Sequence, residues 1–185
     1  ALFVVGAYAG FSLFTATGSF VLSLIGAALV AMLIGLALER GLIQRFYQRP
    51  HEDQILVTFG ISIVLVEIIR GIYGGVGQRV PLPSWGEGVI DMGFVTYPLY
   101  RVEILVIAAT VLFLCWYVLY RTRLGLIIRS GIEDSMMVRL LGINVQRYFM
   151  LVFGIGAAAA GFAGMIYGPI VSIVPDMGFR VLIQS

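Results

Sequence analysis

Residues 1–38 read ALFVVGAYAGFSLFTATGSFVLSLIGAALVAMLIGLAL, without a single charged side chain. A helix that crosses the ~30 Å hydrocarbon core of a bilayer needs ~20 largely apolar residues, so this run is too long for one crossing. The polar, turn-prone sequence Thr15-Ala16-Thr17-Gly18-Ser19 divides it. We therefore expect one membrane span at about 1–15 and a second at 20–38.

The rest of the chain has the same apolar character. Of the 185 residues, 60% are hydrophobic and only 12% are charged, and the mean hydropathy is +1.01. A soluble domain carries about 25% charged residues, so that class is excluded, as are disordered and nucleic-acid-binding proteins. Further apolar stretches predict spans at about 54–73, 102–120 and 148–168. The expected fold is all-α, a polytopic transmembrane helix bundle.

We expect the 185 residues to form a single transmembrane domain that is a fragment of a longer chain. Residue 1 is Ala rather than Met and already lies in an apolar run, and Val181-Leu182-Ile183-Gln184-Ser185 ends within an apolar pattern. The N-terminus lacks the basic flank and the cleavage site of a signal peptide. With one Cys in the chain, an internal disulfide is excluded.

The arginines predict the orientation in the membrane. Segments 39–53 and 121–147 lie on the same side and hold eight arginines, whereas the opposite side holds three, or four with Arg70 at its edge. The positive-inside rule therefore places segments 39–53 and 121–147 in the cytoplasm.

Segment 74–101 then forms an outer loop rich in Gly and Pro. Near its end, Val89-Ile90 and Phe94-Val95 flank Asp91-Met92-Gly93, a pattern typical of a small hairpin. Two interpretations stay open: a spacer loop, or a docking or gating element on the outer face.

The second cytoplasmic segment predicts a short helix at about 131–141. Ser130 and Glu133 match a capping box at its start, and Arg129 can pair with Glu133 one turn away. Gly142 stands where a left-handed C-terminal cap is expected, and Asn144 can cap the fifth span.

This short helix is predicted to have one apolar face. Its apolar residues recur at a spacing of four, with two more beside them: Ile132, Met136, Leu140, Met137 and Leu141. Because eleven residues are too few to cross a bilayer, the helix either lies flat at the lipid interface or inserts into a groove of a partner protein.

The fifth span carries small residues at intervals of four: Gly156, Ala160, Gly164 and Gly168. Such residues let another helix approach closely, so a packing seam is one interpretation. The other is a smooth wall along a substrate path.

Glu67 is an acidic residue well inside the third span. At ~1.5 Å per residue it lies ~20 Å from the cytoplasmic edge, in the outer part of the bilayer. Ionisable groups at such depth are costly and are often functional. Arg70 is three residues away, so a structural ion pair and a role in a transport path are both open.

Catalytic chemistry finds no support in the sequence. His51 has no Cys or second His nearby, so no metal site is expected. There is no phosphate-binding Gly-Lys-Ser/Thr loop and no Ser-His-Asp arrangement. We expect no catalytic residue and no cofactor, and any ATP hydrolysis would take place on another chain.

Several motifs, in order, resemble the permease subunits of branched-chain amino-acid ABC importers, and the H-type subunit most closely. They are Glu39-Arg40, Phe59-Gly60-Ile61-Ser62, Arg121-Thr122-Arg123-Leu124-Gly125, Arg139-Leu140-Leu141-Gly142-Ile143-Asn144-Val145, Gly168-Pro169 and Pro175-Asp176-Met177-Gly178-Phe179. The resemblance covers essentially the whole chain.

The resemblance implies a bacterial inner-membrane subunit with several partners: two ATP-binding subunits, a second related permease and a periplasmic substrate-binding protein that delivers leucine, isoleucine or valine. It makes the short cytoplasmic helix the element that couples to the ATPase. The family's Glu-Ala-Ala falls here on Met136, Met137 and Val138, so Glu133 or Asp134 is the expected acidic substitute. The implied coupling residues are Ser130, Glu133, Asp134, Met136, Met137, Arg139, Leu140 and Gly142.

Other functions stay open at this point. A related importer of a sugar or nucleoside shares the coupling segment. A channel or secondary carrier is disfavoured because no ring of pore-lining charges is evident. A membrane-embedded enzyme is disfavoured because the spans hold no cluster of acids, bases and metal ligands.

Overall fold

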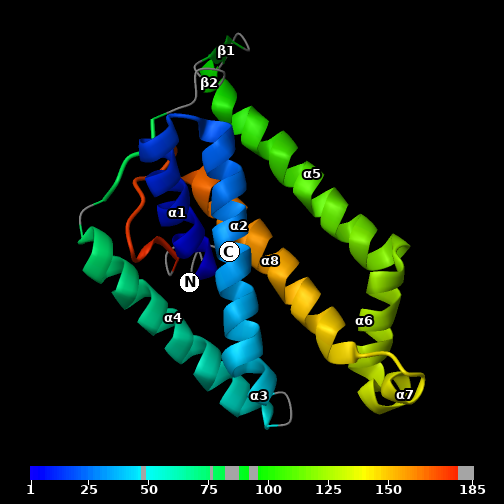
Figure 1. Cartoon of the computed structure of the whole chain (residues 1–185). Coiled ribbons are helices and arrows are strands. Elements are labelled where there is room, and N and C mark those ends of the chain that lie inside the picture. The colour runs from blue at the N-terminus through cyan, green and yellow to red at the C-terminus, as the bar shows by residue number, and fades with distance from the viewer. Residues whose placement is uncertain (47–48, 76, 82–87, 92–95, 179–185) are drawn as a thin grey trace. The chain divides into compact units, whose positions relative to one another are not determined.

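The computed structural model describes residues 1–46, 49–75, 77–81, 88–91 and 96–178, and these are mostly helical (Figure 1). The helices are α1 (Leu2–Thr17), α2 (Phe20–Leu38), the π-helical η1 (Glu39–Ile43), α3 (Gln44–Phe46), α4 (His51–Tyr73), α5 (Leu99–Arg121), α6 (Arg123–Glu133), α7 (Ser135–Leu140) and α8 (Val145–Tyr167). The prediction of an all-α fold is confirmed.

Four helical stretches are long and apolar enough to cross a membrane: Phe20–Phe46, Glu52–Tyr73, Leu99–Arg121 and Val145–Tyr167. Helix α1 is a shorter apolar helix. The predicted break between the first two spans is present, because Gly18 adopts φ 68° and its N–H bonds to the Phe14 carbonyl. Left-handed backbone is nearly free of strain only for glycine, so Gly18 ends α1.

The chain divides into two compact units. One unit comprises residues 1–81 and 150–185, and the other comprises residues 82–149. Helix α8 supplies its first turn to the second unit and the rest of its length to the first.

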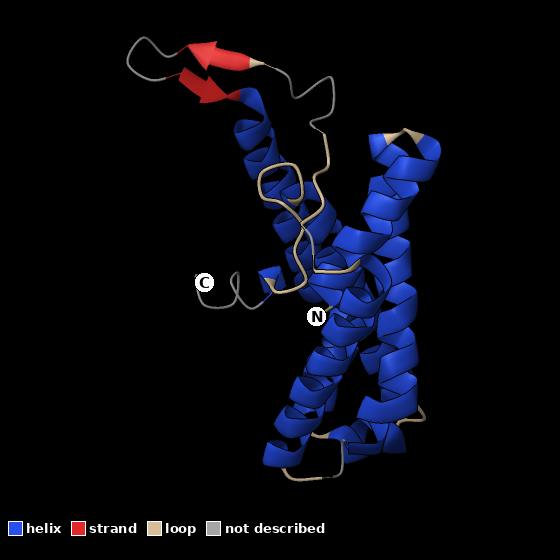
Figure 2. Cartoon of the chain, turned by 90° about the vertical axis from the view of Figure 1, so that its left-hand side faces the viewer, coloured by secondary structure: helices blue, strands red, loops and turns tan. Residues whose placement is uncertain are grey.

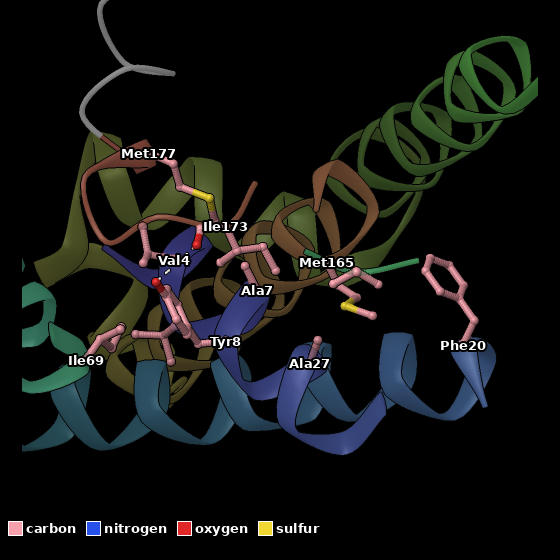
Figure 3. Close-up of a cluster of buried hydrophobic side chains, with 11 residues drawn as sticks. Val4, Ala7, Tyr8, Phe20, Ala27, Ile69, Met165, Ile173 and Met177 are labelled. Atoms are coloured by element: carbon pink, nitrogen blue, oxygen red, sulfur yellow. Dashed lines mark hydrogen bonds between the residues drawn. The ribbon is translucent and has the colours of Figure 1, made fainter. Parts of the chain in front are cut away.

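The first unit packs α1, α2, α4 and most of α8 around one core (Figure 3). Its most buried residues come from α1, from α2, from α8 and from the segment after α8: Val4, Ala7, Tyr8, Ala27, Met165, Ile173 and Met177. Small residues bring the backbones together. A Cβ added at Gly6 would overlap the Cα of Gly161, and a Cβ at Gly161 would overlap the Cβ of Ala31. Helix α8 therefore lies in direct contact with both α1 and α2.

The segment after α8 turns back onto this core. Ile173 and Gln78 form a two-way backbone bridge, with N···O distances of 2.9 and 2.8 Å. The hydroxyl of Tyr8 also donates to the Ile173 carbonyl at 3.2 Å, as the dashed line in Figure 3 marks. Because the Tyr8 hydroxyl and the Gln78 backbone both bond to Ile173, the segment is fixed to α1 and to the residues that follow α4.

The second unit contains a small hairpin, α5, α6, α7 and the start of α8. Strands β1 (Val89–Asp91) and β2 (Thr96–Pro98) pair antiparallel, and β2 leads directly into α5 (Figure 2). The predicted hairpin is therefore present. The expected second strand, Phe94–Val95, lies outside the described residues, and the described strand begins at Thr96.

Candidate functional site

The segment predicted as one short helix is two helices, separated at Asp134. Helix α6 continues to Glu133, and Ser130 lies within it, where its carbonyl accepts the Asp134 N–H at 2.9 Å. Asp134 has extended backbone, and its Oδ1 accepts the N–H groups of Met136 and Met137, both at 2.9 Å. The predicted capping box is therefore wrong: one carboxylate oxygen satisfies two free N–H groups of α7, and Asp134 is its N-cap.

The C-terminal end of α7 matches the prediction. Gly142 has φ 77°, and its N–H bonds to the Arg139 carbonyl at 2.9 Å. The Ile143 N–H bonds to the Val138 carbonyl at 3.4 Å, which completes a Schellman motif. Asn144 then caps α8, since its Oδ1 accepts the Arg147 N–H at 3.3 Å. Helix α7 is short but closed at both ends.

The predicted apolar residues of this segment are all exposed. Their exposed fractions are 72% for Ile132, 73% for Met136, 59% for Met137, 77% for Leu140 and 73% for Leu141. These five residues form what we call the 132–141 apolar patch. Val138 is buried and anchors α7. A patch of large apolar side chains beside exposed Glu133 and Arg139 is typical of a surface that a partner or a membrane covers.

Arg129 does not pair with Glu133, so this predicted ion pair is wrong. Its guanidinium lies over the ring of Tyr120, 5.0 Å from the centroid, and its Nε donates to the Gly125 carbonyl at 3.4 Å. The cause is the sharp turn between α5 and α6. It requires Gly125, because a Cβ there would overlap the Leu119 carbonyl.

The predicted ion pair between Glu67 and Arg70 is confirmed, and Arg70 has a second partner. Arg70 Nη1 lies 2.6 Å from Glu67 Oε1, and Arg70 Nη2 lies 2.8 Å from Asp176 Oδ1. All three side chains are substantially exposed, at 41% for Arg70, 56% for Glu67 and 60% for Asp176. Asp176 appears in the sequence only as part of a family motif, and local spacing gives no signal for this contact.

The four small residues predicted on one helix face do not share one environment: three lie in α8, and Gly168 follows the last residue of the helix. Gly164 packs against the backbone of Phe3, and Gly168 lies close to Ile173, whereas Ala160 is half-buried and a Cβ at Gly156 would meet open space. With 3.6 residues per turn, each step of four advances about 40° around the helix, so Gly156 and Gly164 lie about 80° apart. Gly164 thus makes a close contact with α1, and further close contacts of α8 with α1 and α2 are made at Gly161 and Ala157.

Glu39 is a buried carboxyl group that the site prediction leaves out. It is 1% exposed and opens the π-helical turn η1, directly after α2. π-Helical turns are rare and frequently mark functional positions. Its place in the Glu39-Arg40 motif was the only signal in the sequence.

Metal chemistry has no structural support in the part of the chain that the structure describes. No group of three or more His, Cys, Asp or Glu side chains is close enough there to hold a metal ion.

Comparison with known proteins assigns this chain to a family. Residues 1–184 match the family model described as the branched-chain amino acid transport system permease component. Three curated relatives are high-affinity branched-chain amino acid transport system permease proteins. LivH of Salmonella typhimurium is 27% identical over 84% of this chain and 52% of the relative. LivH of Escherichia coli K12 is 25% identical over 96% and 62%. BraD of Pseudomonas aeruginosa is 29% identical over 71% and 44%.

The chain therefore spans about half the length of the curated relatives that it matches. No solved structure matches this chain with statistical significance.

Proposed function

Because the chain belongs to the family of permease components of the branched-chain amino acid transport system, we propose that it is part of the transmembrane subunit of an ATP-driven importer of branched-chain amino acids. The observation that carries the proposal is the 132–141 apolar patch, most of which lies on α7, a helix closed at both ends. An exposed apolar surface on a rigid element is suited to a groove in a partner protein. The proposed partner is a pair of ATP-binding subunits.

The residues indicate which role this chain has and which role the ATP-binding subunits have. This chain offers helices for crossing the membrane, and its sequence has no phosphate-binding Gly-Lys-Ser/Thr loop. ATP hydrolysis is therefore assigned to the partner subunits. A movement of those subunits on ATP binding would be transmitted through α7 to α8, since Gly142 and Asn144 join the two helices by a short, hydrogen-bonded turn.

The remaining partners belong to the same proposal. A second, related permease completes the membrane domain, and a periplasmic binding protein delivers leucine, isoleucine or valine to the outer face. Segments 39–53 and 121–147 face the cytoplasm by their arginine content, and the bacterial relatives favour the inner membrane as the location. Access then alternates between two states of the bundle, each favoured by a different partner.

The test uses the full-length protein in proteoliposomes with its ATPase subunits and binding protein. We expect ATP-dependent uptake of leucine, no uptake of ribose, and loss of leucine uptake in Gly142→Pro. Proline fixes φ near −65°, which is incompatible with the φ of 77° at Gly142, and it removes the N–H that bonds to Arg139. Gly156→Ala is the control, since a Cβ there meets open space.

Other results would redirect the assignment. Uptake of ribose would move the protein to a sugar importer with the same mechanism. Uptake that survives ATP depletion at a constant proton gradient would identify a channel or secondary carrier. Full leucine uptake by Gly142→Pro would mean that α7 lies at the lipid interface and does not couple to the ATPase subunits.

A further inference from the structure

An aromatic ladder runs along the C-terminal half of α5. The rings of Phe113 and Trp116 have centroids 5.8 Å apart, and those of Trp116 and Tyr120 are stacked with centroids 6.1 Å apart. All three are exposed, at 64%, 48% and 58%. Of the residues in α5, Tyr100 alone is buried, at the other end of the helix. Aromatic side chains at the end of an exposed apolar helix are typical of the level of the lipid headgroups.

Three exposed arginines lie at the end of this ladder: Arg121, Arg123 and Arg129. Arg129 continues the ladder, because its guanidinium lies over Tyr120 and is held there by the Gly125 carbonyl. None of the three forms an ion pair with a described residue, whereas Arg70 contacts two carboxylates. The three positive charges are therefore available to an external anion.

Helix α6 adds N–H donors to the same place. Its N-cap Thr122 makes no side-chain cap, because the hydroxyl donates to the Val118 carbonyl of α5 instead. The first turn of α6 thus starts beside Arg121 and Arg123 without a capping acceptor. Free N–H groups at a helix start favour a negative charge, in addition to the arginines.

We propose that the corner between α5 and α6 binds the headgroup of an anionic phospholipid. The site comprises Phe113, Trp116, Tyr120, Arg121, Arg123 and Arg129. The aromatic ladder would lie along the acyl chains and the glycerol backbone, and the arginines would contact the phosphate. Lipid is favoured over a protein partner because the charges directly continue an exposed apolar helix. The site faces the cytoplasmic leaflet if the proposed orientation holds.

The test measures lipid binding by the full-length protein in detergent, by native mass spectrometry. Dioleoyl phosphatidylglycerol is titrated against dioleoyl phosphatidylcholine. The variant Arg121→Gln/Arg123→Gln/Arg129→Gln removes the three charges. The control Arg40→Gln/Arg45→Gln/Arg49→Gln removes three exposed arginines from the other predicted cytoplasmic segment. Arg123→Gln alone changes an exposed side chain outside the cation–π contact, and it covers the case in which the triple variant does not fold.

We expect wild type to prefer phosphatidylglycerol. Each arginine near an anionic headgroup contributes roughly fivefold, so the triple variant should lose about 100-fold in affinity and Arg123→Gln about fivefold. The affinity of the control variant for phosphatidylglycerol should change by less than about twofold. Trp116→Leu/Tyr120→Leu should weaken the binding of both lipids.

Three results would overturn the proposal. In the first, the two lipids bind equally to wild type. In the second, the triple variant loses no more affinity than the control. In the third, millimolar inorganic phosphate displaces the lipid, which would identify a site for a soluble anion. If the second result is accompanied by loss of binding of the ATPase subunits to the triple variant, the corner is a protein interface. Binding is measured without transport, so these outcomes leave the proposed function untouched.

Discussion

Arg70 and Asp176 lie 106 residues apart in the chain, and Arg70 Nη2 donates to Asp176 Oδ1 at 2.8 Å. The same guanidinium holds Glu67 of its own helix through Nη1. Asp176 belongs to the segment that returns after α8, so this contact joins that segment to α4. The backbone bridge between Gln78 and Ile173 fixes the same segment.

We expect Asp176→Asn to loosen the returning segment slightly. An exposed ion pair contributes about 0.2–1 kcal/mol, and the buried Ile173 and Met177 remain as anchors. Hydrogen exchange at the Ile173 amide should therefore accelerate by up to about fivefold. Glu67→Gln is the matched control, because it removes the other partner of Arg70 and leaves the Asp176 contact in place. Equal acceleration in both variants would contradict a specific role for Asp176.

The same control variant addresses a transport role of Glu67. If Glu67 serves only to pair with Arg70, Glu67→Gln should leave both folding and leucine uptake in proteoliposomes unchanged. Loss of uptake in a variant with unchanged thermal stability would place Glu67 in the transport path instead.

Two glycines of the first unit should respond in opposite ways to the same substitution. Gly6→Ala forces a Cβ into the Cα of Gly161, and overpacking of this kind costs about 1–3 kcal/mol. Gly156→Ala meets open space and should be neutral or stabilise by up to about 1 kcal/mol, since Ala is the better helix former. Thermal unfolding in detergent measures both. Destabilisation by Gly156→Ala would mean that a further helix packs there in the full-length protein.

The long helices could be predicted because length and hydropathy alone define them. The contact between Arg70 and Asp176 could not, because no local pattern relates residues so far apart. The choice between Ser130 and Asp134 as N-cap was open to sequence reasoning, but the capping-box pattern favoured the wrong residue. The capping-box pattern assumes that one helix starts at Ser130, whereas α6 continues to Glu133 and α7 starts after Asp134. On α8 the predicted packing residues include Gly164, which does contact α1, but also Gly156, which does not pack, because a spacing of four drifts around a helix that has 3.6 residues per turn.

Capping of α7 can be tested by comparing the two candidate residues. Asp134→Ala removes the acceptor for Met136 and Met137, which costs about 1 kcal/mol and should accelerate exchange at these two amides about fivefold. Asp134→Asn retains a side-chain oxygen and should stay close to wild type. Ser130→Ala lies within α6 and should have no effect on these amides. Faster exchange of these amides in Ser130→Ala would support the capping box with Ser130 as N-cap.

The 132–141 apolar patch can be tested without unfolding the protein. Met136→Asp/Met137→Asp places two charges on side chains that are 73% and 59% exposed, so stability should change by less than about 0.5 kcal/mol. ATP-driven leucine uptake should fall at least about tenfold, since buried unpaired carboxylates at a partner interface are costly. Ser135→Asp adds a charge at an exposed neighbour and should retain most of the uptake. Unchanged uptake in the double variant, with unchanged binding of the ATPase subunits, would show that the partner does not cover this patch.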